Sequence, residues 1–424
     1  MLNPMRSRLS VRDVVAVAAF LAVGALLGWR VIEHWSVPGQ PLADDKWALC
    51  DFRDAIYYPV VALLNGENAY ASASYMERYP VKCEFPLFLP ATLIVHLPFG
   101  LLPFVTAESV YFLLTVALTP ALAVLALVLA GARVTVTRVF VIATLVLISR
   151  PGYWNLVLGQ LAVTMAVAIY LALLPHRRWT VAAGLGLAFA MVKPTFGVPL
   201  TILMLARGQI REVISGAIVA LGLSLPAVVV LSRAAGGFRE FLPTVLEPLA
   251  YHSRDVNTDA LLSPFRVDAA AVFSHILGVR IGPLGEAAVT ALVLALGVAC
   301  VCCLRRARAP EGDRLSAIVI CLTSVVCCYH QAYDLVVLLF PCAAFAWGSW
   351  TASNGSSSWP RWTACIALLL VGANHLRAPS VVQWMNVGGK WLVAIEVLNG
   401  ALLLVTLAVC GMMTHRCART RQVS

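Results

Sequence analysis

The sequence predicts an all-α protein that crosses a membrane many times. Of its 424 residues, 60% are hydrophobic and only 12% are charged, whereas soluble domains carry about 25% charged residues. Apolar runs recur along the whole chain, and many approach the roughly 20 residues that a helix needs to cross a bilayer. A water-soluble enzyme fold could not cover this much apolar surface, which excludes that class. We therefore predict a single integral membrane domain over residues 1–424, with about ten to thirteen apolar helices.

The first helix is expected at about residues 13–32, after the basic segment "MLNPMRSRLSVRD". This start also resembles a signal peptide, but the apolar run is long for one and has no clear small-residue cleavage site. We interpret it as an uncleaved membrane helix that enters from the cytoplasm. The other expected apolar runs are 86–103, 107–130, 138–149, 161–175, 180–192, 196–206, 212–232, 286–304, 315–328, 335–350, 361–376 and 390–411, with a short or interfacial helix in "AAAVFSHILG".

The arginines fall in short clusters between the apolar runs. The formal net charge of +10 could suggest nucleic acid as a partner, but these clusters do not form one basic face, so we expect none. They follow the positive-inside pattern of cytoplasmic loops instead. The clusters are Arg6/Arg8/Arg12, Arg133/Arg138, Arg177/Arg178, Arg207/Arg211, Arg305/Arg306/Arg308/Arg314, Arg361 and Arg416/Arg419/Arg421. Placing them inside puts two long polar loops, residues 33–85 and 233–270, on the extracytoplasmic side.

One stretch does not fit this orientation directly. An odd number of crossings must separate the first loop from Arg133, yet two apolar runs lie between them. Either the proline-rich run 86–103 is re-entrant or interfacial, or Arg133 and Arg138 lie outside. The sequence leaves both interpretations open.

Two of the twelve cysteines, Cys50 and Cys83, are expected in the first extracytoplasmic loop. The outer side of a bacterial membrane is oxidising, so a disulfide can persist there. We predict a bridge between them that fixes the loop, with two independent thiols as the alternative. The other cysteines are interpreted as small hydrophobes.

Four polar spots interrupt the apolar pattern on the predicted outer face. They are "DFRDAIYYPVVALLNGENAY" from Asp51, "LVLGQ" ending at Gln160, "MVKPTFG" around Lys193, and "YHQAYD" ending at Asp334. Lys193 lies between two short apolar runs, at the expected outer tip of a helical hairpin. An ionisable residue at membrane depth is a functional candidate.

These motifs, in this order, resemble glycosyltransferase family 87, the bacterial polyprenyl-phosphate-mannose-dependent mannosyltransferases. The opening motif carries Asp-Phe, Tyr-Tyr, Leu-x-Gly and Tyr, and it is followed by "EFPLFLPATLIVHLPFGLLP", "LGQ", "VKP", "VNTDALL" and "YDLVVLLFP". The resemblance covers roughly residues 45–345. The chain departs from the family pattern at two places. The family usually has an asparagine shortly after Gly-Gln, whereas Leu161-Ala162-Val163 follows Gln160 here, and Glu84-Phe85-Pro86 stands in place of Tyr-Pro-Pro.

The resemblance implies a GT-C-type fold, a multi-pass protein of the plasma membrane whose active site faces the extracytoplasmic side. The donor would be a polyprenyl-phosphate sugar carrying a hexose, mannose in this family, and the acceptor a glycolipid or glycan. No nucleotide sugar, cofactor or metal ion is expected. A transporter or a flippase for lipid-linked sugars is the alternative, since transporters also keep ionisable residues in broken helices.

Sugar transfer from a polyprenyl phosphate needs a carboxylate base for the acceptor hydroxyl and a cation for the leaving phosphate. Asp51 is the first candidate for the base, Asp54 the second, and Asp44 and Asp45 the third. For each of them, a solvated loop carboxylate or a helix cap is the alternative role.

Lys193 is the leading phosphate ligand, with snorkelling to the interface as its alternative role; Arg150 and Arg254 are weaker candidates. The candidates for binding the sugar or the acceptor are Tyr57, Tyr58, Gln160, Asn257, His330 and Asp334. For the tyrosines the alternative is an interfacial aromatic belt, and for the others ordinary structural hydrogen bonds.

Overall fold

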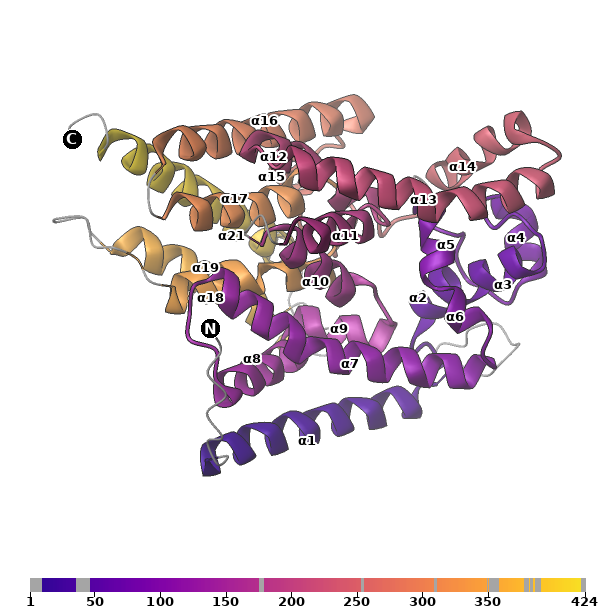
Figure 1. The fold of residues 1–424 in the computed structure, drawn as a ribbon, viewed down its shortest axis with the longest axis horizontal. Helices are drawn as coiled ribbons and strands as arrows, with labels where there is room; N and C mark the ends of the chain where they lie inside the picture. Colours follow the sequence, from indigo (N-terminus) through magenta and orange to yellow (C-terminus); the bar gives the residue numbers. More distant parts are fainter. Residues whose placement is uncertain are drawn as a thin grey trace.

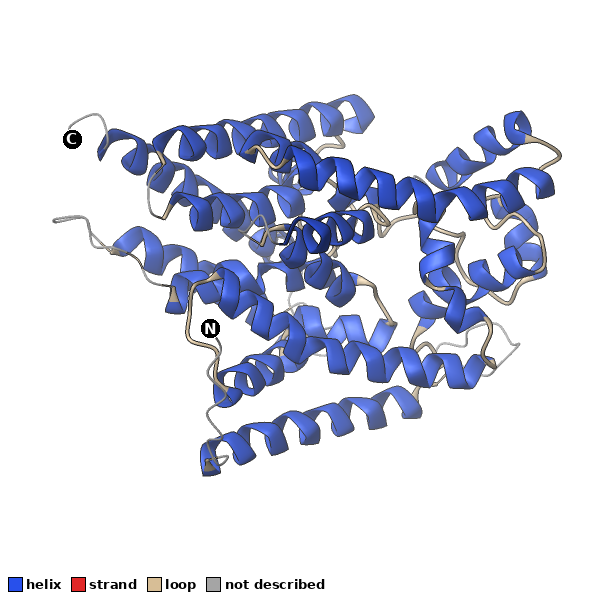
Figure 2. Cartoon of the chain, in the orientation of Figure 1, coloured by secondary structure: helices blue, strands red, loops and turns tan. Residues whose placement is uncertain are grey.

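The computed structural model describes residues 10–35, 46–174, 179–252, 255–308, 311–348, 350, 358–376, 381, 384–385 and 390–420. Regular structure within these residues is helical, apart from two isolated β-bridges that pair Trp35 with Ala48 and Arg266 with Gln331 (Figure 2). The predicted all-α class is confirmed.

Five of the described helices are long and apolar enough to cross a membrane. They are α1 (Val11–Glu33), α7 (Phe104–Leu129), α13 (Ile210–Ala234), α16 (Gly282–Ala307) and α21 (Lys390–Thr420), the last over Val397–Arg419. A sixth span arises if α8 (Val136–Ile148) and α9 (Arg150–Leu158) are taken together, although they bend by 72° at Ser149. Several apolar helices exist, as expected for a multi-pass membrane protein, but a count of ten to thirteen is not confirmed.

The remaining apolar runs form shorter helices that pack among the long ones. They are α10 (Ala162–Ala172), α11 (Thr180–Ala190), α12 (Pro194–Arg207), α17 (Gly312–Cys327), the 3-10 helix η3 (Ala332–Leu338), α18 (Leu339–Trp347) and α19 (Trp359–Ala373). Every residue of α17 from 315 to 327 is buried. A helix that is apolar on all sides belongs in the interior, and α17 forms part of the core against which α12, α16 and α21 pack.

The first polar loop is folded into short helices rather than left open. It contains α2 (Cys50–Phe52), the π-helix η1 (Arg53–Tyr57), α3 (Tyr58–Leu64) and α4 (Ser72–Arg78), followed by α5 (Ala91–Val95) and α6 (Leu97–Gly100). The second contains α14 (Phe238–His252) and leads to α15 (Ala269–Leu277). The short helices and α14 gather at the right of Figure 1, which we call the loop end.

The two polar loops contact each other at the loop end. The side-chain amide of Asn68 donates to the Thr244 hydroxyl at 2.8 Å, and the Ser72 amide donates to the Glu247 carboxylate at 3.2 Å. The sequence placed both loops on one side of the membrane, and these contacts agree with that.

The run 86–103 contains no helix long enough to cross a membrane. Its two helices, α5 and α6, have five and four residues, far below the roughly 20 that a crossing requires. Only α7 therefore connects the loop end to Arg133. The Asp13 carboxylate accepts hydrogen bonds from the Thr137 amide at 3.0 Å and hydroxyl at 2.6 Å. Arg133 and Arg138 thus lie at the same end of the bundle as Arg12, which favours the interpretation of 86–103 as a re-entrant or interfacial segment.

Candidate active site

The segment that carries Asp51 is held against α9 by a close backbone approach. The Leu49 amide donates to the Val157 carbonyl at 2.8 Å. Gly159 ends α9 with φ +73°, and a Cβ there would lie 2.7 Å from the Phe52 Cβ. Only glycine accommodates both the left-handed backbone and this contact. Leu49 itself adopts φ 55°, a strained conformation of the kind that concentrates at functional sites.

This close approach places the Asp51 side chain beside the side chain of Gln160. The Gln160 side-chain amide donates to the Asp51 carboxylate. The Gln160 carbonyl accepts a hydrogen bond from the Tyr111 hydroxyl of α7 at 3.0 Å. Burial raises the pKa of Asp51 to about 7, and the nearby Asp54 charge adds to this, whereas Gln160 and Lys193 oppose it. A carboxylate poised near neutrality is suited to general-base work.

Lys193 forms the other half of the site. It precedes Pro194, the first residue of α12, so its side chain projects from the turn between α11 and α12. Its ammonium donates to both Asp334 oxygens, at 2.7 and 2.8 Å. It also lies 5.3 Å from the ring centre of Phe196 and 5.4 Å from that of Tyr333. The ammonium group of Lys193 is therefore held by side chains of the protein.

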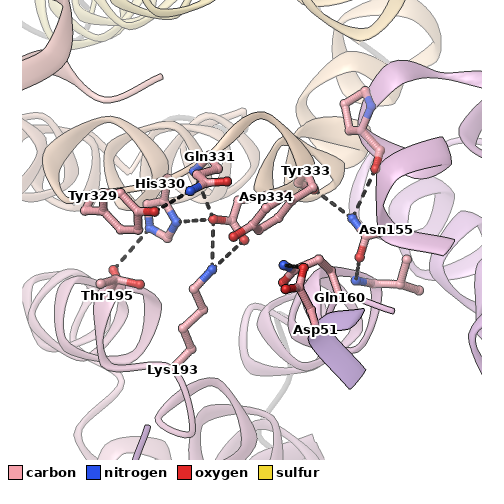
Figure 3. Close-up of polar contacts among 12 residues, drawn as sticks. Asp51, Asn155, Gln160, Lys193, Thr195, Tyr329, His330, Gln331, Tyr333 and Asp334 are labelled. Carbon is pink, nitrogen blue, oxygen red and sulfur yellow. Dashed lines mark hydrogen bonds and ion pairs between the residues drawn. The ribbon is translucent and has the colours of Figure 1, made fainter. Parts of the chain in front are cut away.

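Asp334 holds this lysine from a buried position. Its side chain is 1% exposed, and it also interacts with His330 Nδ1 at 2.9 Å and accepts from the Gln331 amide at 3.2 Å. The other His330 nitrogen lies 3.4 Å from the Thr195 carbonyl. Figure 3 shows Lys193, Asp334 and His330 grouped together, with Asp51 and Gln160 between this group and Asn155. The predicted polar pair His330–Asp334 is thus present, with Lys193 as its third member.

Asn155 and Arg266 also support the site, and the sequence did not single them out. Asn155 is fully buried; it donates to the Tyr333 carbonyl at 2.8 Å, and its carbonyl oxygen accepts from the Val163 amide at 3.2 Å. The sequence feature that could have identified Asn155 is its position as a polar residue within the largely apolar stretch "WNLVLGQ". Arg266 pairs with Asp268 at 2.9 Å beside the bridge to Gln331, which ties the second polar loop to the segment that carries His330 and Asp334.

Both carboxylate oxygens of Asp54 are engaged by other groups of the protein. One of its oxygens accepts from the Lys82 and Cys83 amides at 2.9 and 3.2 Å, and the other pairs with the buried Arg53 at 2.9 Å. Burial raises the pKa of Asp54, and Arg53 opposes this. Because its oxygens hold the loop closed, Asp54 is less suited than Asp51 to accept a substrate proton.

Cys50 and Cys83 are both free cysteines, so the expected disulfide is not formed in this structure. Cys50 is half-buried on α2, and Cys83 is exposed. The sequence predicted that a disulfide between these two cysteines would fix the first polar loop. In the structure, hydrogen bonds from the backbone amides of Lys82 and Cys83 to the Asp54 carboxylate fix this part of the loop instead.

Several other predicted residues are not brought to this cluster. Tyr57 and Tyr58 are buried, and their rings pack on Phe104 in the core rather than lining a surface where a sugar could stack. Arg150 begins α9, about 12 Å along the helix axis from its other end near Gln160, and stacks on Trp154. Asn257 lies in an exposed turn, where it donates to Asp255. Arg254, Asp44 and Asp45 lie outside the described residues.

Gly159→Ala is expected to disrupt the contact between α9 and α2. The left-handed backbone costs a non-glycine residue about 1–2 kcal/mol, and overpacking adds about 1–3 kcal/mol. Gly66 is the matched control, since it has φ +72° but open space around its missing Cβ. A thermal melt of the purified variants should show a clearly larger loss for Gly159→Ala than for Gly66→Ala. Equal losses would mean that the Phe52 contact does not position Asp51.

Comparison with known proteins places the chain in a family. Residues 87–328 match the model of glycosyltransferase family 87, more than half of the chain. The match contains Asn155, Gln160 and Lys193; Asp51 precedes it, and His330 and Asp334 follow it by a few residues. No curated protein and no solved structure matches significantly. The match to the family model is sufficient to conclude that this membrane protein belongs to glycosyltransferase family 87.

Proposed function

We propose that the protein transfers a hexose, mannose in the first instance, from a polyprenyl-phosphate sugar to a hydroxyl group of a glycolipid or glycan. The observation that carries this proposal is the pairing of two opposite groups. Asp51, with a pKa of about 7, lies close enough to Lys193 for the lysine charge to act on it. Membership of a glycosyltransferase family supplies the reaction class.

The two groups have complementary roles in a direct displacement. The acceptor hydroxyl gives its proton to the Asp51 carboxylate while its oxygen attacks the anomeric carbon. The bond from that carbon to the phosphate oxygen breaks, and the polyprenyl phosphate leaves with the electron pair. Lys193 stabilises the charge that develops on this phosphate. A single displacement of this kind inverts the anomeric configuration.

Asp334 and His330 prepare Lys193 for this role. Two of the three ammonium protons meet the Asp334 oxygens, and the third remains to meet a phosphate oxygen. Fixing the ammonium before the reaction avoids reorganisation as charge develops. His330 and the Gln331 amide in turn fix Asp334. Gln160 orients the Asp51 carboxylate through its own hydrogen bond.

The arrangement of charge supports an extracytoplasmic site in the plasma membrane. Arg12, Arg133 and Arg138 share the end of the bundle opposite α2–α6 and α14, which is the loop end in Figure 1. The positive-inside rule then assigns the loop end to the outside. A polyprenyl-phosphate donor fits this side because it can diffuse in the bilayer to the site.

Activity is expected to rise with pH through about 7. The base must be ionised to accept a proton, and burial has raised its pKa to about 7, so the protonated, inactive form predominates below that value. The rate at saturating donor should fall about tenfold per pH unit well below pH 7 and level off above it. This is measured as kcat against pH in reconstituted protein. A profile with its midpoint near pH 4 would contradict a buried Asp51 base.

Transfer is distinguished from flipping by the chemical identity of the product. Purified protein in proteoliposomes, given a radiolabelled polyprenyl-phosphate hexose and an alkyl glycoside acceptor, should form a new glycosidic bond and release polyprenyl phosphate. Translocation of the intact labelled lipid without a new product would favour the flippase alternative and contradict the proposal.

A further inference from the structure

The ring of Tyr333 borders the open side of the Lys193 ammonium group. That ammonium lies between two aromatic rings, 5.3 Å from the centre of Phe196 and 5.4 Å from the centre of Tyr333. Phe196 is 1% exposed and closes one side, whereas Tyr333 is half-buried. Because the side chain of Lys193 is 12% exposed, a ligand can reach the ammonium, and Tyr333 lies where it would arrive.

The backbone of Tyr333 is held on two sides, which gives the ring a fixed place. Its carbonyl accepts a hydrogen bond from the Asn155 side chain at 2.8 Å. The amide of the preceding residue, Ala332, donates to the Phe265 carbonyl at 3.0 Å. Figure 3 shows Tyr333 between Asn155 and Asp334, its neighbour in η3. The same short helix thus positions both the counter-ion of the lysine and the tyrosine beside it.

The hydroxyl group of Tyr333 has no hydrogen-bond partner among the residues that the structure describes, and it is not one of the fully buried polar atoms there that lack a partner. It is therefore open to a ligand. Tyrosine hydroxyls inside a protein usually find a partner within it. This holds for four buried tyrosines that each donate to a backbone carbonyl, namely Tyr70, Tyr75, Tyr111 and Tyr170.

The surroundings of this hydroxyl make it a hydrogen-bond donor. Burial raises the pKa of Tyr333, and Tyr329 and the charges of Asp334 and Asp51 add to this, so the hydroxyl keeps its proton at neutral pH. The two carboxylates belong to different halves of the site, since Asp334 holds Lys193 and Asp51 is the proposed base. Tyr333 thus lies within electrostatic range of both halves, which is where the proposed function places the bond that breaks.

We propose that Tyr333 is a second ligand of the donor phosphate and that its hydroxyl donates a hydrogen bond to an oxygen of the phosphate that Lys193 holds. This inference rests on the proposed function, which supplies the phosphate. A phosphate oxygen is a better acceptor than a sugar hydroxyl, because hydrogen bonds to an ionised acceptor are roughly twice as strong as those between neutral groups. As the bond to the anomeric carbon breaks, charge grows on the phosphate and this hydrogen bond strengthens.

The first test measures binding without turnover. Farnesyl phosphate and farnesol share one hydrocarbon chain and differ in the phosphate, and their dissociation constants are measured with wild-type protein and Tyr333→Phe in lipid nanodiscs. A hydrogen bond to a charged group contributes about 10- to 100-fold in affinity. We expect Tyr333→Phe to bind farnesyl phosphate about tenfold or more weakly and farnesol as the wild type does. Equal binding of farnesyl phosphate by the two proteins, or equal weakening for both probes, would overturn the inference.

The second test separates this contact from a structural role. Tyr333→Phe breaks no hydrogen bond among the described residues, so its melting temperature should equal that of the wild type. Tyr170→Phe is the matched control and should melt lower, because the Tyr170 hydroxyl bonds the Val337 carbonyl and the Phe340 amide. In transfer assays, Tyr333→Phe should lower kcat/KM for the donor about tenfold or more and leave the acceptor KM unchanged. A loss confined to the acceptor KM, or a drop in melting temperature as large as that of Tyr170→Phe, would contradict the inference.

The Tyr333 contact and the proposed function fail in different ways. If the wild-type protein forms no glycoside from any donor while Tyr333→Phe still weakens the binding of farnesyl phosphate, the proposed transfer fails and the phosphate contact stands. If transfer proceeds and Tyr333→Phe leaves the binding of farnesyl phosphate unchanged, the transfer stands and the contact fails.

Discussion

Asp51→Asn is expected to lower kcat by about 100-fold or more while leaving the protein folded. General acid–base catalysis contributes about 10²–10⁴-fold, and asparagine cannot accept the proton of the acceptor hydroxyl. The asparagine carbonyl can still accept the hydrogen bond from Gln160 that orients residue 51, so the surrounding structure should persist. The measurement is the initial rate of labelled glycoside formation at saturating donor and acceptor, with a thermal melt to verify folding.

Asp54→Asn is the matched control for this prediction. Asparagine there breaks the buried pair with Arg53, and removing one partner of such a pair costs about 3–5 kcal/mol. We therefore expect Asp54→Asn to lower the melting temperature more than Asp51→Asn. Near-normal turnover in Asp51→Asn, combined with lost turnover in a folded Asp54→Asn, would move the role of base to Asp54.

Lys193→Ala is expected to lower kcat/KM for the donor by about 100-fold or more. Removing one preorganised electrostatic donor typically costs about 10²–10³-fold in rate, and this change also removes the cation from the phosphate site. Lys193→Arg should recover only part of the loss, because the guanidinium fork places its donors differently. Steady-state kinetics with the donor varied at saturating acceptor measure both effects.

The loss must be separated from a loss of folding, because Lys193→Ala leaves the buried Asp334 without this partner. The double variant Lys193→Ala/Asp334→Asn removes the charge of both. It should regain thermal stability relative to Lys193→Ala while staying inactive. Unchanged donor kinetics in Lys193→Ala would show that the lysine serves only as the counter-ion of Asp334.

The sequence predicted the class of fold, and it singled out several residues that the structure brings together in the candidate site, because each carries a local signal. Lys193 and Asp334 are charges in apolar surroundings, and Gln160 follows the glycine that caps the end of α9. The structure brings these residues to Asp51 or to one another. Their mutual distances are set by the packing of α9, α12 and η3, which no local pattern reports.

The residues that the sequence placed less well were those with ambiguous local signals. In sequence, the Tyr57-Tyr58 pair is compatible with stacking on a sugar, with a membrane interface or with a buried position. The structure shows that both rings pack on Phe104 in the core. Asp54 looks like Asp51 in sequence, but only the fold brings the Lys82 and Cys83 amides to it. Likewise, the prolines of 86–103 indicated an interrupted segment, and only the structure shows that α5 and α6 are each too short to cross a membrane.

We propose that Asp51 and Lys193 form one site for sugar transfer from a polyprenyl-phosphate donor. The most direct measurement supplies wild-type protein in nanodiscs with the same labelled hexose on two donors, a polyprenyl phosphate and a nucleotide, together with a dodecyl mannoside acceptor. We expect labelled glycoside from the polyprenyl-phosphate donor alone, with one polyprenyl phosphate released per bond formed, and loss of both products in Asp51→Asn. Transfer from the nucleotide sugar, or equal transfer by the wild type and Asp51→Asn, would contradict it.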